Sequence, residues 1–235
     1  NTWDQVLISD ADDAVQCIEI SPDFSSDRTI YIGTENSGVL ISRDGGENWH
    51  AANTGLPSLC INDLAISPNS RDSYLIAAAT GDGIALSANG GGSWKRIGAT
   101  SETVLSLSVY GKSSQVLLAG LFDTGIVRSE DGGNSWQQAN QGLAAHYLIG
   151  LALSPAFQAD SSIFAWGASE GVLRSEDGGQ SWQSPSGDVK NSNILSLAIS
   201  PSFASDGALF AGTSAGIIHS MDRGSSWRTR GLENE

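Results

Sequence analysis

Short stretches in which apolar and polar residues alternate recur along the whole chain, separated by Gly-rich turns. Four of them end in a Ser that precedes Pro, at 17–21, 63–67, 150–154 and 196–200, while a fifth ends at Gly111. A second and a third alternating run follow each one. Alternation with a period of two predicts half-buried β-strands, and four short strands in every 42 to 46 residues predict propeller blades.

The turn after each third run carries the motif S-x-D-x-G-x-x-W in five copies. A short Asp side chain can accept hydrogen bonds from backbone N–H groups of its own turn, Gly supplies positive φ, and Trp offers a large apolar surface. Asn89 replaces Asp in the second copy, and Arg223 replaces the first Gly of the fifth, where we expect a strained or altered turn. The motif residues are Ser42, Asp44, Gly46, Trp49, Ser87, Asn89, Gly91, Trp94, Ser129, Asp131, Gly133, Trp136, Ser175, Asp177, Gly179, Trp182, Ser220, Asp222, Gly224 and Trp227.

These motifs resemble the Asp-box (BNR) repeat family, which includes sialidases, xyloglucanase-type hydrolases, sortilin-like receptors and photosystem II assembly factors. The resemblance covers essentially the whole chain and implies an all-β, five-bladed β-propeller of four-stranded antiparallel blades. We expect a single domain over 1–235, with blades at about 14–53, 59–98, 103–140, 147–184 and 193–230. In this family the boxes lie opposite the usual active site, so they specify the fold and say little about function.

The N-terminus predicts an extra strand over 2–8, because Trp3 opens it as the box tryptophans open theirs. Six strand-opening tryptophans then serve five blades. Either this strand pairs beside the last blade, or the chain is part of a longer propeller. The ring is accordingly closed, or it is an open arc whose edges favour self-association.

The innermost strands predict large-against-small packing near the axis, because small residues separate two apolar columns. The small residues are Ala65, Ser108, Ala152 and Ala198. Glu19 takes the equivalent place in the first repeat and is either exposed to the channel or paired.

A net charge of −14 with 12 dispersed Lys and Arg residues argues against nucleic acid and anionic membrane surfaces as partners. No apolar run reaches the roughly 18–20 residues of a membrane span. The start at Asn1 fits a processed secreted protein or a trimmed chain, and we expect an extracellular or periplasmic location. Cys17 and Cys60 form either a disulfide or two buried free thiols, and we expect neither a metal nor another cofactor.

Enzyme chemistry finds little support in the sequence. A sialidase needs three converging arginines, a Tyr–Glu pair, an acid Asp and usually an Arg-Ile-Pro signature, which this chain lacks. Arg43, Arg128 and Arg174 stand beside boxes, where we expect solvated side chains. Glycoside hydrolysis needs two carboxylates about 5–10 Å apart, and nothing pairs the acids of the predicted functional face. Those acids are Asp10, Asp12, Asp13, Glu35, Asp63, Asp82, Asp123, Glu170 and Asp188.

The loops between blades differ from repeat to repeat, which favours one asymmetric site over a pocket in every blade. The candidate residues for binding a protein or a glycan are Trp166, Phe122, Asp123, His146 and Tyr147. Trp166 alternatively fills a gap between blades. We therefore expect a binding or scaffolding module, while a carbohydrate-active enzyme and a structural subunit of a larger assembly stay open.

Overall fold

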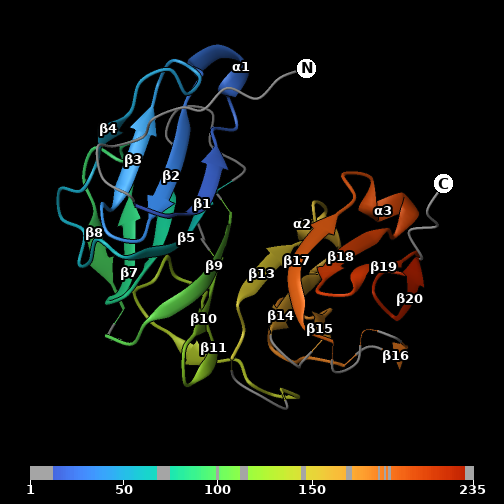
Figure 1. Cartoon of the computed structure of the whole chain (residues 1–235). Coiled ribbons are helices and arrows are strands. Elements are labelled where there is room, and N and C mark those ends of the chain that lie inside the picture. Colours follow the sequence, from blue (N-terminus) through green and yellow to red (C-terminus); the bar gives the residue numbers. More distant parts are fainter. Residues whose placement is uncertain are drawn as a thin grey trace. The chain divides into compact units, whose positions relative to one another are not determined.

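The computed structural model describes residues 13–67, 75–98, 101–111, 116–143, 147–167, 171–184, 186–187, 189 and 192–230 (Figure 1). Nearly all regular elements in this part of the chain are β-strands, so the predicted all-β class is confirmed. No described helix is long and apolar enough to cross a membrane. The chain divides into two compact units: unit 1 comprises Asn1–Leu117 and Ser129–Ser135, and unit 2 comprises Leu118–Arg128 and Trp136–Glu235.

Successive antiparallel sheets form the first three propeller blades. Blade 1 has the strand order β1-β2-β3-β4, with β1 (Val15–Ile20), β2 (Ile30–Thr34), β3 (Val39–Ser42) and β4 (His50–Ala51). Blade 2 follows the same order with β5 (Ile61–Ile66), β6 (Ile76–Thr80), β7 (Gly83–Ser87) and β8 (Lys95–Ile97). Blade 3 contains β9 (Val104–Tyr110), β10 (Val116–Leu121), β11 (Gly125–Ser129) and β12 (Gln137–Gln138).

The last two blades depart slightly from this scheme. Blade 4 contains β13 (Gly150–Leu153), β14 (Ile163–Gly167) and β15 (Gly171–Ser175), and a single bridge from Arg174 to Gln183 takes the place of its fourth strand. Blade 5 contains β17 (Ile194–Ile199), β18 (Leu209–Thr213), β19 (Gly216–Ser220) and β20 (Ser226–Arg230). A fifth strand, β16 (Ser186–Gly187), pairs parallel to β20. The predicted extra strand over 2–8 lies outside the described residues.

Three short helical turns follow the Ser-Pro ends at Ser21, Ser154 and Ser200 and were not predicted from the sequence. They are α1 (Phe24–Asp27), α2 (Phe157–Asp160) and α3 (Phe203–Asp206), each within the pattern Ser-Pro-x-Phe-x-x-Asp. In the first, Ser21 Oγ donates to Asp27 Oδ2 at 2.6 Å, and Asp27 Oδ1 accepts from Thr29 N at 2.9 Å. The same bonds recur in the other two copies, so this pattern closes the connection between the first and second strands.

Each Asp box closes its own hairpin, as predicted. In the first box Ser42 Oγ donates to Asp44 Oδ1 at 2.7 Å and accepts from Gly46 N at 2.8 Å, while Asn48 N donates to Asp44 Oδ1 at 3.0 Å. Bonds to Ser135 lower the pKa of the equivalent Asp131 to about 2, because they favour the charged carboxylate. Arg223, with φ of +60°, adopts the left-handed conformation of the glycines that it replaces.

The second glycine of a box also faces the preceding blade. A Cβ at Gly179 would lie 2.4 Å from Leu118 Cδ2, and a Cβ at Gly91 would lie 2.4 Å from Ile41 Cδ1. Gly133 against Ile97 and Gly224 against Phe164 repeat the contact. The second glycine of the box therefore leaves the space in which an apolar side chain of the preceding blade packs.

Box tryptophans join blades as well. The indole Nε1 of Trp94 donates to the carbonyl oxygen of Ala52 at 2.7 Å, and Trp94 N donates to Thr54 O at 2.8 Å. Trp182 makes the matching bonds to Ala139 and Gln141, both at 2.8 Å. Each of these tryptophans thus links the end of its own box to the chain that leaves the preceding blade.

We predict that Gly179→Ala destabilises the protein by about 1–3 kcal/mol more than Gly46→Ala, because it overpacks a blade interface. Both glycines have positive φ, +87° and +99°, so backbone strain is common to the two variants. A Cβ at Gly46 meets nothing closer than 3.8 Å. Urea denaturation measures the difference, and equal losses would refute the interblade role.

We predict that Asn89→Asp stabilises the second box. Asn89 Nδ2 donates to Ser93 Oγ at 3.0 Å, whereas Ser135 Oγ donates to the charged Asp131 Oδ2 at 2.6 Å. A carboxylate would replace the neutral bond by a charge-assisted one, worth about 0.5 kcal/mol at this exposed position. Calorimetry should show a rise in Tm of about 1–2 °C, and a fall would contradict this account.

Candidate functional site

Two of the predicted binding residues form an exposed aromatic patch in unit 2. Phe122, directly after β10, and Tyr147, just before β13, pack edge to face with ring centroids 5.5 Å apart at 85°. They remain 46% and 44% exposed. Asp123 is an exposed neighbour of Phe122. We call the pair Phe122 and Tyr147 the aromatic patch.

The backbone beneath the aromatic patch is firmly held. The side chain of Asn140 donates to Thr124 O at 2.7 Å and accepts from Ile126 N at 2.8 Å, which braces the β10–β11 turn next to Phe122. On the other side, a Cβ at Gly167 would lie 2.3 Å from the carbonyl oxygen of Tyr147. Both rings are therefore presented from tightly packed backbone.

Trp166 does not join the aromatic patch. Its half-buried indole lies against Gly150, where an added Cβ would come within 2.0 Å of the ring. The side chain also packs against the apolar cluster between blades 4 and 5, which includes Phe164, Ile194 and Trp227. This position corresponds to the alternative in which Trp166 fills a gap between blades. His146 lies outside the described residues.

The three box-adjacent arginines bind neighbouring boxes. Arg128 Nε donates to Gly178 O at 2.7 Å, and Arg174 Nη1 donates to Ser225 Oγ at 2.8 Å. Both side chains are half-buried, so the expectation of solvated arginines is wrong for them. Arg43 is exposed and donates to Gly90 O at 3.3 Å. Each guanidinium satisfies an acceptor of the next box, a contact that a single repeat does not reveal.

Among the candidate acids, Asp63 is bound by backbone N–H groups of its own strand and of blade 3. It is half-buried on β5, and its oxygens accept from Leu64 N at 2.9 Å and from Leu107 N at 2.8 Å. Burial raises the pKa of Asp63 to about 7. Burial and the nearby charge of Asp63 likewise raise the pKa of Glu19 to about 7.

No group of three His, Cys, Asp or Glu residues suited to a metal ion occurs within the described ranges. Cys17 and Cys60 are half-buried free thiols, the second of the two alternatives. Burial raises the pKa of the Cys17 thiol to about 12, so this thiol is not activated as a nucleophile.

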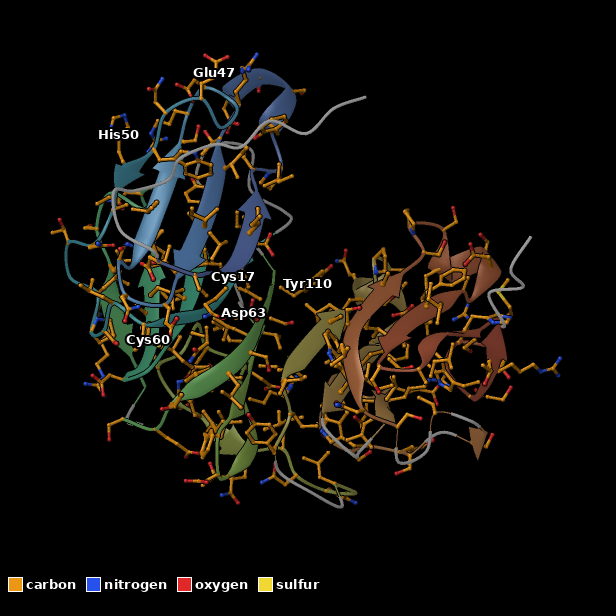
Figure 2. All side chains as sticks on the ribbon, viewed as in Figure 1. Cys17, Glu47, His50, Cys60, Asp63 and Tyr110 are labelled. Carbon is orange, nitrogen blue, oxygen red and sulfur yellow. The ribbon has the colours of Figure 1, made fainter. Side chains whose placement is uncertain are left out.

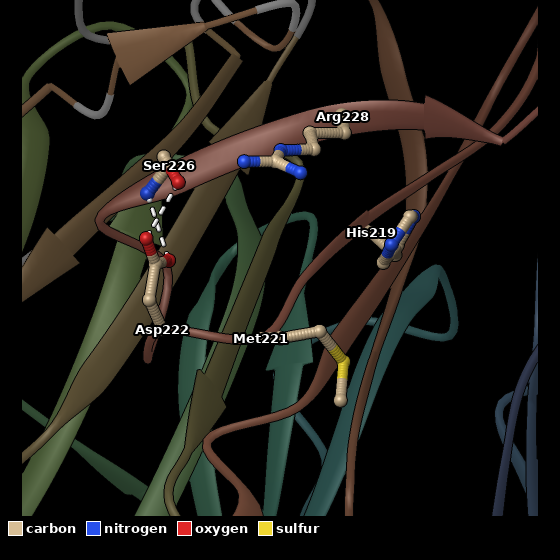
Figure 3. Close-up of a pocket in the computed structure, with 5 residues that line it drawn as sticks. All are labelled: His219, Met221, Asp222, Ser226 and Arg228. Carbon is tan, nitrogen blue, oxygen red and sulfur yellow. Dashed lines mark hydrogen bonds between the residues drawn. The ribbon is translucent and has the colours of Figure 1, made fainter.

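A cavity of about 250 Å³ lies on blade 5 and was not anticipated from the sequence (Figure 3). Its lining comprises His219, Met221, Asp222, Ser226 and Arg228. Asp222 is held by its box, accepting from Ser226 N at 2.9 Å. Phe210, nearby on the same blade, is 39% exposed, whereas the equivalent Phe164 of blade 4 is fully buried against blade 5. Phe210 stacks against His219 with ring centroids 6.2 Å apart, so an aromatic side chain lies beside the lining.

Two family models match the chain. The model for BNR/Asp-box repeats matches residues 40–51. The chain carries BNR/Asp-box repeats. The model described as photosynthesis system II assembly factor YCF48 matches residues 149–235, which contain the last two boxes. The resemblance seen in the sequence is thus confirmed.

Solved structures share the propeller fold at low identity. YCF48 from Cyanidioschyzon merolae has a TM-score of 0.65 at 15% identity, with 97% of this chain and 74% of that chain covered. A structure of YCF48 bound to D1 peptide gives 0.63 at 20% identity, with coverage of 93% and 68%. The GH74 xyloglucanase from Xanthomonas campestris gives 0.73 at 19% identity, with coverage of 97% and 39%.

This chain spans less than two fifths of the GH74 chains that it matches. No curated protein gives a significant match. At these identities the solved structures bear on the fold alone, which is that of five β-propeller blades.

We predict that Trp166→Ala lowers the free energy of unfolding by about 2–3 kcal/mol, somewhat less than for a fully buried Trp. The loss follows from its packing between blades 4 and 5. Chemical denaturation measures it, with Leu195→Ala as an exposed control in the same unit. An unchanged free energy of unfolding would contradict the packing role and favour Trp166 as a surface binding residue.

Proposed function

We propose that this chain is a non-catalytic propeller module that binds a protein segment through the aromatic patch. The observation that carries the proposal is the edge-to-face pair of Phe122 and Tyr147, nearly half exposed and braced from below. Amphipathic aromatic side chains with few rotatable bonds are typical anchors of protein interfaces. Ordering them on binding costs little entropy, because packing already restrains them.

The negative charge of the chain limits the chemical class of the partner. The protein carries a net charge of −14, and Asp123 stands exposed beside Phe122. A neutral or cationic segment with an apolar side chain would complement both the rings and the field of the protein. The structure of YCF48 bound to D1 peptide supports the general idea that a propeller of this kind takes a peptide.

A carbohydrate-active enzyme is the alternative, and the likeness to a GH74 xyloglucanase is its support. The charge of Asp63 raises the pKa of Glu19, but the oxygens of Asp63 are engaged by Leu64 N and Leu107 N. The described cavity has neither acid in its lining. The described residues therefore offer more support for a binding function than for a hydrolytic one. A glycan ligand, a scaffolding role and an extracellular or periplasmic location stay predictions from the sequence.

A peptide array that includes D1 peptide tests the proposal. We expect Phe122→Ala combined with Tyr147→Ala to weaken the best-bound peptides at least about tenfold, because each ring is an anchor. Leu195→Ala serves as the matched control, since Leu195 is 58% exposed elsewhere in unit 2 and should leave binding intact.

Thermal unfolding should be almost unchanged in the double variant. Equal binding by the wild type and the double variant would overturn the assignment of the patch. Release of reducing sugars from xyloglucan by the wild-type chain would overturn the non-catalytic role.

A further inference from the structure

The second Asp box holds an amide where the other four boxes hold a carboxylate. Asn89 stands at this place and is exposed at the turn between β7 and β8. In the first box the equivalent turn lies at the exposed end of the β3–β4 hairpin, where Figure 2 labels Glu47. Gly90 follows Asn89 and forms with it the only Asn-Gly pair in the sequence. Water therefore has access to an asparagine whose next residue has no side chain.

The box binds the side-chain amide of Asn89 at both of its polar atoms. Its Oδ1 accepts from Ser87 Oγ at 2.9 Å and from Ser93 N at 2.9 Å. Its Nδ2 donates to Ser93 Oγ at 3.0 Å. Two donors on a carbonyl oxygen stabilise the negative charge that develops on this oxygen when a nucleophile attacks the carbonyl carbon. The amide is thus held in surroundings that favour attack at Cγ.

A cation of the preceding blade lies at the same turn. Arg43 Nη2 donates to the carbonyl oxygen of Gly90 at 3.3 Å. Arg128 makes the equivalent contact with Gly178 of the fourth box, where the preceding residue is the acid Asp177. In the second box the residue in that place is the neutral Asn89. A negative charge at residue 89 would complete the arrangement of the fourth box.

The third box shows what a carboxylate gains at this position. Ser135 N and Ser129 Oγ donate to Asp131 Oδ1 at 2.8 and 2.9 Å, as their counterparts do to Asn89. Ser135 Oγ also donates to Asp131 Oδ2 at 2.6 Å, whereas Ser93 Oγ accepts from Asn89. These bonds lower the pKa of Asp131 to about 2. The site therefore stabilises a carboxylate more than it stabilises the amide that occupies it.

We propose that Asn89 is a self-modifying site, at which the folded chain converts asparagine to aspartate by deamidation. The backbone nitrogen of Gly90 loses its proton to hydroxide and attacks Asn89 Cγ. The new N–C bond closes a succinimide ring, and the Cγ–Nδ2 bond breaks. Nδ2 leaves as ammonia, with a proton from the Ser93 hydroxyl group that water then replaces. Water opens the succinimide, so one asparagine and one water give one aspartate and one ammonia.

The box also decides which product forms. Attack of water at Cγ restores the normal backbone and gives aspartate, whereas attack at the backbone carbonyl carbon diverts the chain through the side chain and gives isoaspartate. Ser87 Oγ and Ser93 N stabilise negative charge on Oδ1 and therefore favour attack at Cγ. We expect aspartate to predominate in the folded chain. Isoaspartate should predominate in the unfolded chain, where neither donor is held in place.

Incubation of the full chain at mildly alkaline pH, followed by peptide mass spectrometry, tests the proposal. The peptide that contains residue 89 should gain about 1 Da and elute chiefly with an aspartate standard. Asn53 is the matched control, because its side chain also donates to Ser37 O and accepts from Val39 N. Thr54 follows it, so Asn53 should stay unconverted. Absence of conversion at residue 89, or equal conversion at Asn53, would overturn the proposal.

The same incubation of the unfolded chain in denaturant separates the role of the box from the general chemistry of an Asn-Gly pair. We expect the ratio of aspartate to isoaspartate to be at least about tenfold higher in the folded chain, because the folded box directs water to Cγ. Equal ratios in the two states would show that the box does not direct the reaction and would overturn the proposal.

Two variants test the groups that touch the reacting atoms. Ser93→Ala removes the hydroxyl group beside Nδ2 but keeps the backbone donor, and it should slow the conversion at least about threefold. Gly90→Arg should slow it at least about tenfold, because a side chain hinders attack by the adjoining nitrogen. The fifth box has Arg223 at this position with φ of +60°, and a Cβ at Gly90 would lie 3.7 Å from Tyr31 Oη, so the hairpin can form. Unchanged conversion in both variants would overturn the proposal.

Discussion

The contact between a box glycine and the blade before it is the constraint on which the described architecture depends. Gly91, Gly133, Gly179 and Gly224 each lie where a Cβ would strike an apolar side chain of the preceding blade. The same turn needs positive φ, so one residue meets a conformational and a steric demand together. Arg128 and Arg174 then bind acceptors of the adjacent box. The Asp box therefore closes its own hairpin and also packs against the preceding blade. This double role explains why the box recurs while the loops around it vary.

The aromatic patch is separate from this framework but is supported by it. Asn140 braces the turn beside Phe122, and Gly167 packs against the backbone of Tyr147. Loops carried on such a rigid base can change without cost to the blades, and this freedom is what makes them suitable for binding. Trp166 shows the opposite case: an aromatic side chain that looks available in the sequence is used to fill space between blades.

Acids occupy two contrasting environments. Asp44 and Asp131 stand at exposed box turns, where donated hydrogen bonds lower their pKa values. Glu19 and Asp63 lie on innermost strands, where burial raises theirs. The same chemical group is thus kept charged in one place and is protonated more readily in the other. Solvation and the supply of donors decide which of these occurs.

The sequence by itself determined the strands, the boxes and the blade order, because alternation and turn chemistry act over a few neighbouring residues. The helical turns α1 to α3 could also have been found, since Ser-Pro-x-Phe-x-x-Asp is a local pattern. Only the tertiary structure decided that Phe122 meets Tyr147, that Trp166 turns inward and that Asp63 binds Leu107 N of the next blade. These pairs join residues of different repeats or distant loops. Their proximity depends on how whole blades stack, which no local pattern encodes.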